Sequence, residues 1–238
     1  MLRAALEGRP IDAITVKTRA RRKALLVADM DSTIVTGETL DELAGFAGIG
    51  EKIAAITTRA MRGELDFKEA LRERVSMLKG LNLDALEKTW ERVHLTRGAR
   101  ELVATMRAKG ALTALVSGGF SFFTGKVAAQ LGFDAHRSNT LLDDGAALTG
   151  GVGEPILDRD SKLAALHEFA LQRGVKLSAT LAVGDGANDL DMIRAAGLGV
   201  AFHAKPIVAM EARAKVDHAD LRALLFAQGY PASAFVTG

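Results

Sequence analysis

The chain has 238 residues, enough for one large domain or a core with a smaller insert, and it contains no cysteine. A disulfide framework, a thiolate metal site and a catalytic thiol are therefore excluded. The formal net charge of +2, from 31 basic and 29 acidic residues, excludes a strongly basic nucleic-acid coat protein. No apolar run reaches the roughly 18 residues of a transmembrane helix, so we expect a cytoplasmic protein with no membrane partner.

Residues 1–23 form a basic leader. Seven Lys and Arg residues against Glu7 and Asp12 give it a charge of +5, which leaves 24 basic and 27 acidic residues, or −3, for the rest. The leader is too short for a domain with its own core, so we expect a solvated segment or the stub of a regulatory region. A nucleic-acid contact is the alternative, but residues 17–23 contain no aromatic side chain for base stacking, and we expect no nucleic-acid partner.

Beyond the leader, continuous apolar runs alternate with segments of helical periodicity. The runs cover residues 24–28, 111–116, 179–183 and 198–202, and the helical patterns cover about 97–109, 121–131, 161–173 and 187–196. Continuous apolar strands suit a sheet that is covered on both faces. The alternation predicts an α/β fold, a doubly wound (Rossmann-like) parallel sheet whose ligand site lies at the carboxyl ends of its strands.

Residues 37–95 contain no strong strand signal. Apolar residues repeat at helical spacing there, as in Leu40, Leu43 and Ala44. We therefore expect residues 37–95 to form a helical cap over the site, with residues 24–36 and 96–238 forming the core. In residues 139–157, Asp143, Asp144 and Gly145 separate two short apolar stretches, which predicts a hairpin.

Two carboxylates, Asp29 and Asp31, follow the first predicted strand. Burying two unpaired carboxylates is costly, and a divalent cation such as Mg2+, which prefers oxygen ligands, removes that cost. A helix-capping turn is the alternative interpretation.

Three further features lie at predicted strand ends or helix starts. The sequence Gly-Asp-Gly-Ala-Asn-Asp of residues 184–189 offers Asp185 as a metal ligand, with Asn188 and Asp189 behind it. Ser117 and Gly118 offer a hydroxyl and a free amide to a phosphate, and Lys162 offers an ammonium. Taken alone, each feature also has an ordinary structural interpretation. The two glycine-containing sequences are typical of turns, and Lys162 is typical of a solvated surface lysine.

Taken together, the four features resemble the haloacid dehalogenase superfamily of phosphohydrolases, because along the chain they follow the order Asp29 with Asp31, Ser117 with Gly118, Lys162, and residues 184–189. The resemblance implies an α/β core with an inserted cap and a Mg2+ cofactor. We hypothesise that Asp29 attacks phosphorus and that Asp31 acts as general acid and base. The metal would then be held by Asp29, the backbone carbonyl of Asp31, and Asp185, while Lys162 balances charge.

Within that superfamily the insert looks like that of the phosphoserine phosphatase family, through Glu38, Phe67 and Arg74. The chemistry fits, because the planar guanidinium of Arg74 suits a carboxylate, Glu38 suits an ammonium, and Phe67 excludes water. The expected partner is O-phosphoserine, and the expected role is the last step of serine biosynthesis. The substrate-binding set would be Glu38, Phe67, Arg74, Ser117, Gly118, Lys162 and Asn188.

Other functions remain open from sequence alone. A phosphotransferase that uses an alcohol as acceptor, a phosphatase for another small phosphate, and a non-catalytic ligand sensor fit the same residues. The stereochemistry of the substrate is equally open, and the protein is expected to be a monomer or a homodimer.

Overall fold

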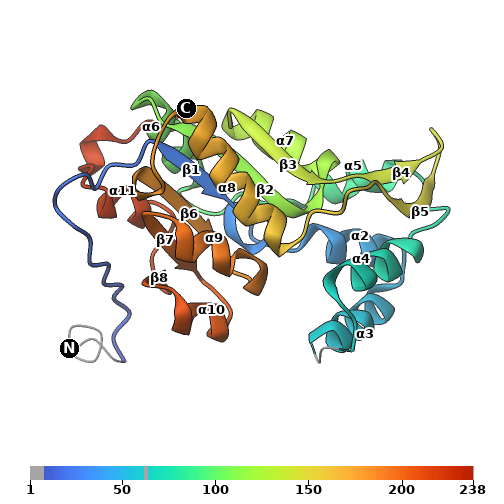
Figure 1. Cartoon of the computed structure of the whole chain (residues 1–238). Helices are drawn as coiled ribbons and strands as arrows, with labels where there is room; N and C mark the ends of the chain where they lie inside the picture. The colour runs from blue at the N-terminus through green and yellow to red at the C-terminus, as the bar shows by residue number, and fades with distance from the viewer. Residues whose placement is uncertain (1–7, 62–63, 238) are drawn as a thin grey trace.

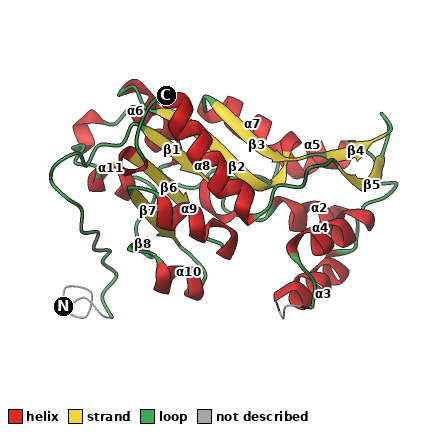
Figure 2. Cartoon of the chain, in the orientation of Figure 1, coloured by secondary structure: helices red, strands yellow, loops and turns green. Residues whose placement is uncertain are grey.

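The structure is a computed structural model that describes residues 8–61 and 64–237. At its centre is a six-stranded parallel sheet with strand order β3-β2-β1-β6-β7-β8 (Figures 1 and 2). The strands are β1 (Leu25–Ala28), β2 (Leu112–Phe120), β3 (Ala135–Asn139), β6 (Thr180–Gly184), β7 (Leu198–Phe202) and β8 (Ala214–Val216). The predicted α/β fold is confirmed, and all four apolar runs are strands of this sheet.

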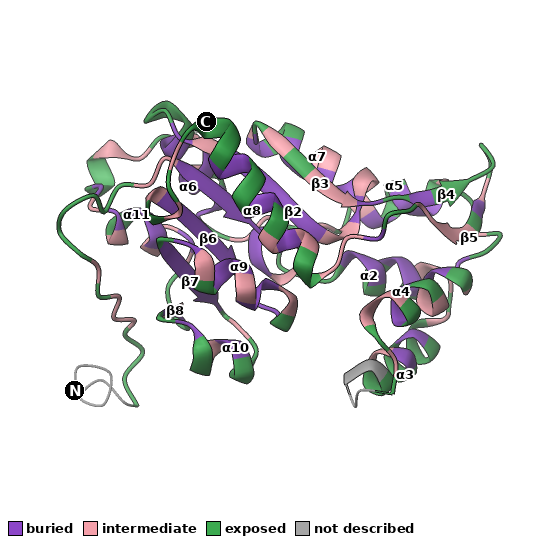
Figure 3. Ribbon diagram, viewed as in Figure 1, coloured by how far each residue is buried: buried purple, intermediate pink, exposed green. Residues whose placement is uncertain are grey.

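The two edge strands, β3 and β8, were not predicted from the sequence. Both contain polar residues, and β3 is only partly buried (Figure 3). An edge strand has a neighbour on one side only and need not be apolar throughout, so it lacks the signal that marks a central strand.

Helices cover both faces of the sheet. They are α6 (Ala99–Ala108), α7 (Ser121–Leu131), α8 (Arg159–Arg173), α9 (Leu190–Ala195), α10 (Pro206–Glu211) and α11 (Ala223–Ala227). Successive residues of β1 point to opposite faces: Leu26 joins a core cluster with α6, α7 and α11, whereas Leu25 and Val27 join one with α8 and α9. Burial on both faces explains why β1 is continuously apolar.

Between β1 and α6 the chain forms four helices, α2 (Thr39–Phe46), α3 (Gly50–Met61), α4 (Phe67–Ser76) and α5 (Asp84–Trp90). The predicted hairpin is present as β4 (Leu141–Asp143) and β5 (Leu148–Val152). It packs beside these helices (Figure 1), because the Gly80 amide donates to the Leu148 carbonyl at 2.8 Å and the Leu148 amide donates to Leu81 at 2.9 Å. The sequence analysis did not anticipate this attachment.

Short irregular turns link these elements, and the described part of the leader contacts the body through Asp12, Ile14 and Val16. The turns are Met30–Ile34, Leu177–Ala179, Ala187–Asp189 and Ala232–Ala234. The Asp12 carboxylate accepts hydrogen bonds from the amides of Asp217, His218 and Ala219 at 2.7, 3.1 and 2.7 Å. Within the described residues, no helix is both long and apolar enough to cross a bilayer.

Candidate active site

Three neighbouring strands bring the predicted polar residues together. Asp29 follows β1, Asp185 follows β6, and Ser117 lies near the end of β2. Because β2, β1 and β6 are adjacent and parallel, their carboxyl ends meet at one edge of the sheet. Strand β2 extends past the predicted boundary, so Ser117 and Gly118 lie in the strand, where its pairing with β3 shifts register.

A tight turn after β1 fixes Asp29 and Asp31. The Asp29 amide donates to the Val183 carbonyl at 3.0 Å, which ties the turn to β6. Within the turn, Ser32 has a left-handed φ of 53°. The Asp31 carboxylate accepts the amide of Thr39 at 2.9 Å and the hydroxyl of Ser117 at 3.4 Å, so it spans the start of α2 and strand β2.

Lys162 is buried between two carboxylates. Its Nζ lies 2.7 Å from Asp29 Oδ1 and 2.6 Å from Asp189 Oδ1, and its side chain is 2% exposed. Burial disfavours the ammonium, but the carboxylates of Asp189 and Asp29 outweigh burial and raise the pKa of Lys162 above its ordinary value. Lys162 is therefore a permanent cation in the floor of the site.

Asp29, Asp185 and Asp189 form a buried acidic cluster, with carboxylate oxygens within 4.8 Å of one another. Burial raises the pKa of Asp29 well above its usual range and that of Asp185 to about 6, and in both cases Asp189 adds repulsion. The three carboxylates are opposed by two ammonium groups, Lys162 and, 3.9 Å from Asp185, the half-exposed Lys205, so the donor set keeps an excess of negative charge. A divalent cation with oxygen ligands fits that excess. The Asp31 carboxylate is not in this cluster.

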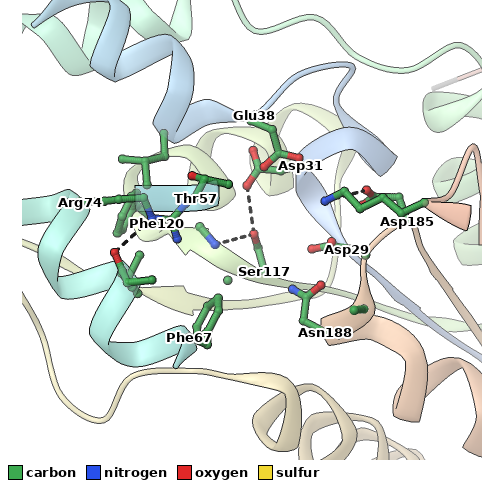
Figure 4. Close-up of a pocket in the computed structure, with 18 of the residues that line it drawn as sticks. Asp29, Asp31, Glu38, Thr57, Phe67, Arg74, Ser117, Phe120, Asp185 and Asn188 are labelled. Atoms are coloured by element: carbon green, nitrogen blue, oxygen red, sulfur yellow. Dashed lines mark hydrogen bonds and ion pairs between the residues drawn. The ribbon is translucent and has the colours of Figure 1, made fainter. Parts of the chain in front are cut away.

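Above the cluster is a cavity of about 400 Å³ (Figure 4). Of the predicted site residues, it is lined by Asp29, Asp31, Glu38, Phe67, Arg74, Ser117, Gly118, Asp185 and Asn188. Lys162 and Asp189 do not line it. Residues from the α2–α4 region, including Arg74 and Phe67, lie across from Asp29 and Asp185.

The charged side chains that line the cavity are not evenly distributed around it. Burial, followed by the repulsion of Glu38, raises the pKa of Asp31 to about 7. The Glu38 carboxylate in turn accepts the hydroxyl of Ser32 at 2.7 Å. The Arg74 side chain is half-buried, and its Nε donates to the Ala70 carbonyl at 3.2 Å. The cavity thus has an anionic side, formed by Asp29, Asp31, Asp185 and Glu38, with the cationic Arg74 lying apart from it (Figure 4).

Among the lining residues with polar side chains, the sequence analysis missed two. Thr57 comes from α3, and Lys205 follows β7 with its Nζ 3.9 Å from Asp185 Oδ2. The position of Lys205 after a buried strand could have indicated it, since it shares that signal with Asp29. His203 follows the same strand but lies in a different cavity, where its ring stacks on Phe202.

Comparison with known proteins gives consistent matches. The family model described as haloacid dehalogenase-like hydrolase matches residues 26–194. A phosphoserine phosphatase from Streptococcus thermophilus is 48% identical over 199 residues, covering 84% of this chain and 93% of that protein. A solved structure of a phospho-aspartyl intermediate analogue of phosphoserine phosphatase superposes with a TM-score of 0.80 at 41% identity, covering 86% of this chain and 98% of that one.

Some relatives are longer. The phosphoserine phosphatase from Streptomyces coelicolor is 43% identical over 95% of this chain, which spans 55% of that protein. The match still covers the sheet, the helices of residues 37–95 and the acidic cluster. On these grounds the chain belongs to the haloacid dehalogenase-like hydrolases and, within them, to the phosphoserine phosphatase family of phosphoric monoester hydrolases.

Proposed function

We propose that the protein hydrolyses O-phospho-L-serine to L-serine and phosphate. The observation that carries the proposal is that one cavity joins Asp29 and Ser117 to Glu38 and Arg74. Phosphoserine has a phosphate, an ammonium and a carboxylate, and the cavity offers an opposite partner for each. The names of the relatives point to the same substrate.

Asp29 is the proposed nucleophile. Among the described residues, the Met30 amide and Lys162 both contact Oδ1, at 2.8 and 2.7 Å, which leaves Oδ2 to attack phosphorus. The new bond joins Asp29 to phosphorus as the bond from phosphorus to the serine oxygen breaks. Water then attacks the aspartyl-phosphate, which releases phosphate and restores Asp29.

Asp31 is the proposed proton carrier. With its pKa raised to about 7, it is partly protonated at neutral pH and can protonate the departing serine oxygen. The resulting carboxylate then takes a proton from the attacking water, which returns Asp31 to its first state.

Mg2+ is the proposed cofactor, because the acidic cluster carries the charge and the oxygen donors that it requires. Asp29, Asp185 and the backbone carbonyl of Asp31 would hold it, with Asp189 shared between the cluster and Lys162. When bound, the ion supplies positive charge to the phosphoryl oxygens.

A phosphate-release panel tests the proposal. We expect O-phospho-L-serine with Mg2+ to outperform its D isomer, phosphothreonine and p-nitrophenyl phosphate, and we expect Asp29→Asn to lose about a thousandfold or more in kcat because the nucleophile is gone. Equal rates for all substrates would contradict the assignment of O-phospho-L-serine as the substrate. Near-normal turnover by Asp29→Asn would contradict the assignment of Asp29 as the nucleophile. Alcohol acceptors added to the assay test for phosphotransfer, which would appear as substrate loss exceeding phosphate release.

The wider setting is proposed from the same family relationship. The reaction would form the last step of serine biosynthesis in the cytoplasm. Residues 24–36 and 96–238 would act as the core and residues 37–95 as the cap, with residues 1–23 as a leader. The monomer or homodimer state stays a prediction.

A further inference from the structure

Helix α4 has two functional faces. Phe67, Leu71 and Arg74 line the cavity, whereas Lys68 and Arg72, one turn apart, reach the segment that precedes α8. Lys68 Nζ lies 2.8 Å from Asp158 Oδ2. Arg72 Nη2 lies 2.7 Å from Glu154 Oε1. We name these two ion pairs the α4 latch.

The Lys68–Asp158 pair of the latch lines a crevice outside the substrate cavity. This crevice has a volume of about 590 Å³, and Phe67 and Asn188 line both spaces. Lys68 lines it from α4 and Asp158 from the N-terminal cap of α8. Opening the crevice would therefore move Phe67 away from the core. Phe67 packs closely there, since a methyl group built on Gly118 would lie 3.3 Å from its ring.

Asp158 connects α4 to the helix of the buried lysine. Its Oδ2 contacts Lys68, while its Oδ1 accepts the amide of Ser161 at 3.1 Å and so caps α8. Four residues further on, α8 carries Lys162, which contacts Asp29. A single carboxylate thus joins the helix that carries Arg74 to the helix that holds the nucleophile.

We propose that Lys68, Asp158, Arg72 and Glu154 are positioning residues that hold Phe67 and Arg74 at the depth at which they meet the substrate. The proposal rests on the proposed function. None of the four lines the wall that faces Asp29, so they act through α4. Exposed ion pairs contribute modestly, and we therefore expect effects of about two- to fivefold per pair on substrate binding.

Two single variants and their double variant test the first pair. Lys68→Met keeps the stem of the side chain, and Asp158→Asn keeps an oxygen that can cap α8. Each single variant should raise KM for O-phospho-L-serine about two- to fivefold with kcat within about twofold. The double variant should be no worse than either single variant, because both remove the same contact. Additive effects would overturn the proposal.

A charge swap tests the second pair without touching a helix cap. Arg72→Glu and Glu154→Arg should each raise KM, and the combined swap should restore it to within about twofold of the parent, because opposite charges again face each other. The inhibition constant of inorganic phosphate, which occupies the Asp29 end only, should not change in any variant. Failure of the swap to rescue KM would overturn the proposal, as would a parallel change in phosphate inhibition.

The pair between Lys126 and Glu87 provides a matched control. It joins α7 to α5 at 2.9 Å and is as exposed as the latch, but α5 contributes no residue to the cavity. Lys126→Met and Glu87→Gln should leave KM unchanged, and an increase equal to that of the latch variants would overturn the proposal. Failure of the proposed function is distinguishable, because the parent protein would then show no preference for O-phospho-L-serine.

Discussion

Lys162, Asp29 and Asp189 form a group of three buried charges that links the stability of the fold to the site. One ammonium there serves both Asp29 and Asp189 at hydrogen-bond distance, and all three side chains are almost fully buried. A buried ion pair is held mainly by the cost of leaving either partner alone. The catalytic floor of the site is therefore also a structural element.

Replacing that ammonium should weaken the fold. Lys162→Met leaves two buried carboxylates without their cation, and we expect the free energy of unfolding to fall by about 3–5 kcal/mol in metal-free buffer. Urea unfolding measures this change. The exposed Lys176→Met is the control and should be near neutral. A loss below about 1 kcal/mol for Lys162→Met would show that the pairing is not structural.

Arg74 should be sensitive to shape as well as to charge. Lysine keeps the positive charge but loses the planar pair of donors that matches a carboxylate. We expect Arg74→Lys to raise KM for O-phospho-L-serine about 10- to 100-fold, the loss of a charge-assisted hydrogen bond. Steady-state kinetics measures this, with phosphate inhibition as the unchanged reference. An unaltered KM would mean that Arg74 does not bind the substrate.

At the scale of elements, α8 begins with a strong capping arrangement. The Asp158 carboxylate accepts a hydrogen bond from the Ser161 amide, and the Asp158 amide donates in return to the Ser161 hydroxyl oxygen at 3.2 Å, which forms a capping box. The Lys68 ammonium, helped by these cap hydrogen bonds, lowers the pKa of Asp158 from 3.8 to about 2.

This cap predicts a pH-dependent stability difference. Because the folded-state pKa of Asp158 is lowered, its contribution is complete above pH 3.8 and is lost as the pH falls towards 2. We expect Asp158→Ala to be less stable than the parent by about 1 kcal/mol at pH 7, with the difference shrinking between pH 4 and 2. Denaturant unfolding across this range measures it. A difference that is constant with pH would exclude the carboxylate as its source.

The elements also show which parts of the fold the apolar pattern of the sequence predicts and which it does not. Strands β1, β2, β6 and β7 were predicted because burial on both faces requires apolar side chains throughout. The edge strands β3 and β8 carry no such requirement. Helix α9 is shorter than its predicted span, because residues 187–189 form a separate turn that brings the amide of Gly186 to Asp189.

At the scale of the whole molecule, the described part of the leader is attached to the body at several points. Asp12 accepts three backbone amides of residues 217–219, and Ile14 and Val16 pack against the main core. Further along, the Lys23 amide donates to the Gln228 side chain at 3.0 Å. The described leader is therefore a strap that is held at these points, while most of its residues are exposed, as expected for a solvated segment.

Removing the Asp12 carboxylate should release the strap. We expect Asp12→Ala to speed tryptic cleavage within residues 17–23 and hydrogen exchange at the amides of residues 217–219, since those donors lose their acceptor. Asp12→Asn keeps one acceptor oxygen, so its cleavage and exchange rates should lie between those of the parent and those of Asp12→Ala. Exchange rates equal to those of the parent would show that Asp12 does not hold the leader.

The candidate site was also predictable only in part. Asp29, Asp185 and Ser117 could be identified because each lies at the end of an apolar strand. Lys205 shares that signal but is one of many lysines, and Thr57 lies on a helix with no local mark of function. The division of roles between Asp31, which faces Thr39 and Ser117, and Asp189, which faces Lys162, depends on side-chain directions that spacing does not specify.

The sequence by itself determined the parallel α/β sheet, the helical insert and the strand ends that carry the acidic residues, because burial and backbone periodicity are local properties of a pattern. Only the tertiary structure decided which carboxylates share Lys162, how α4 is tied to the start of α8, and where the hairpin and the leader dock. Those contacts join residues far apart in the chain, and their geometry follows from packing and charge pairing among whole elements.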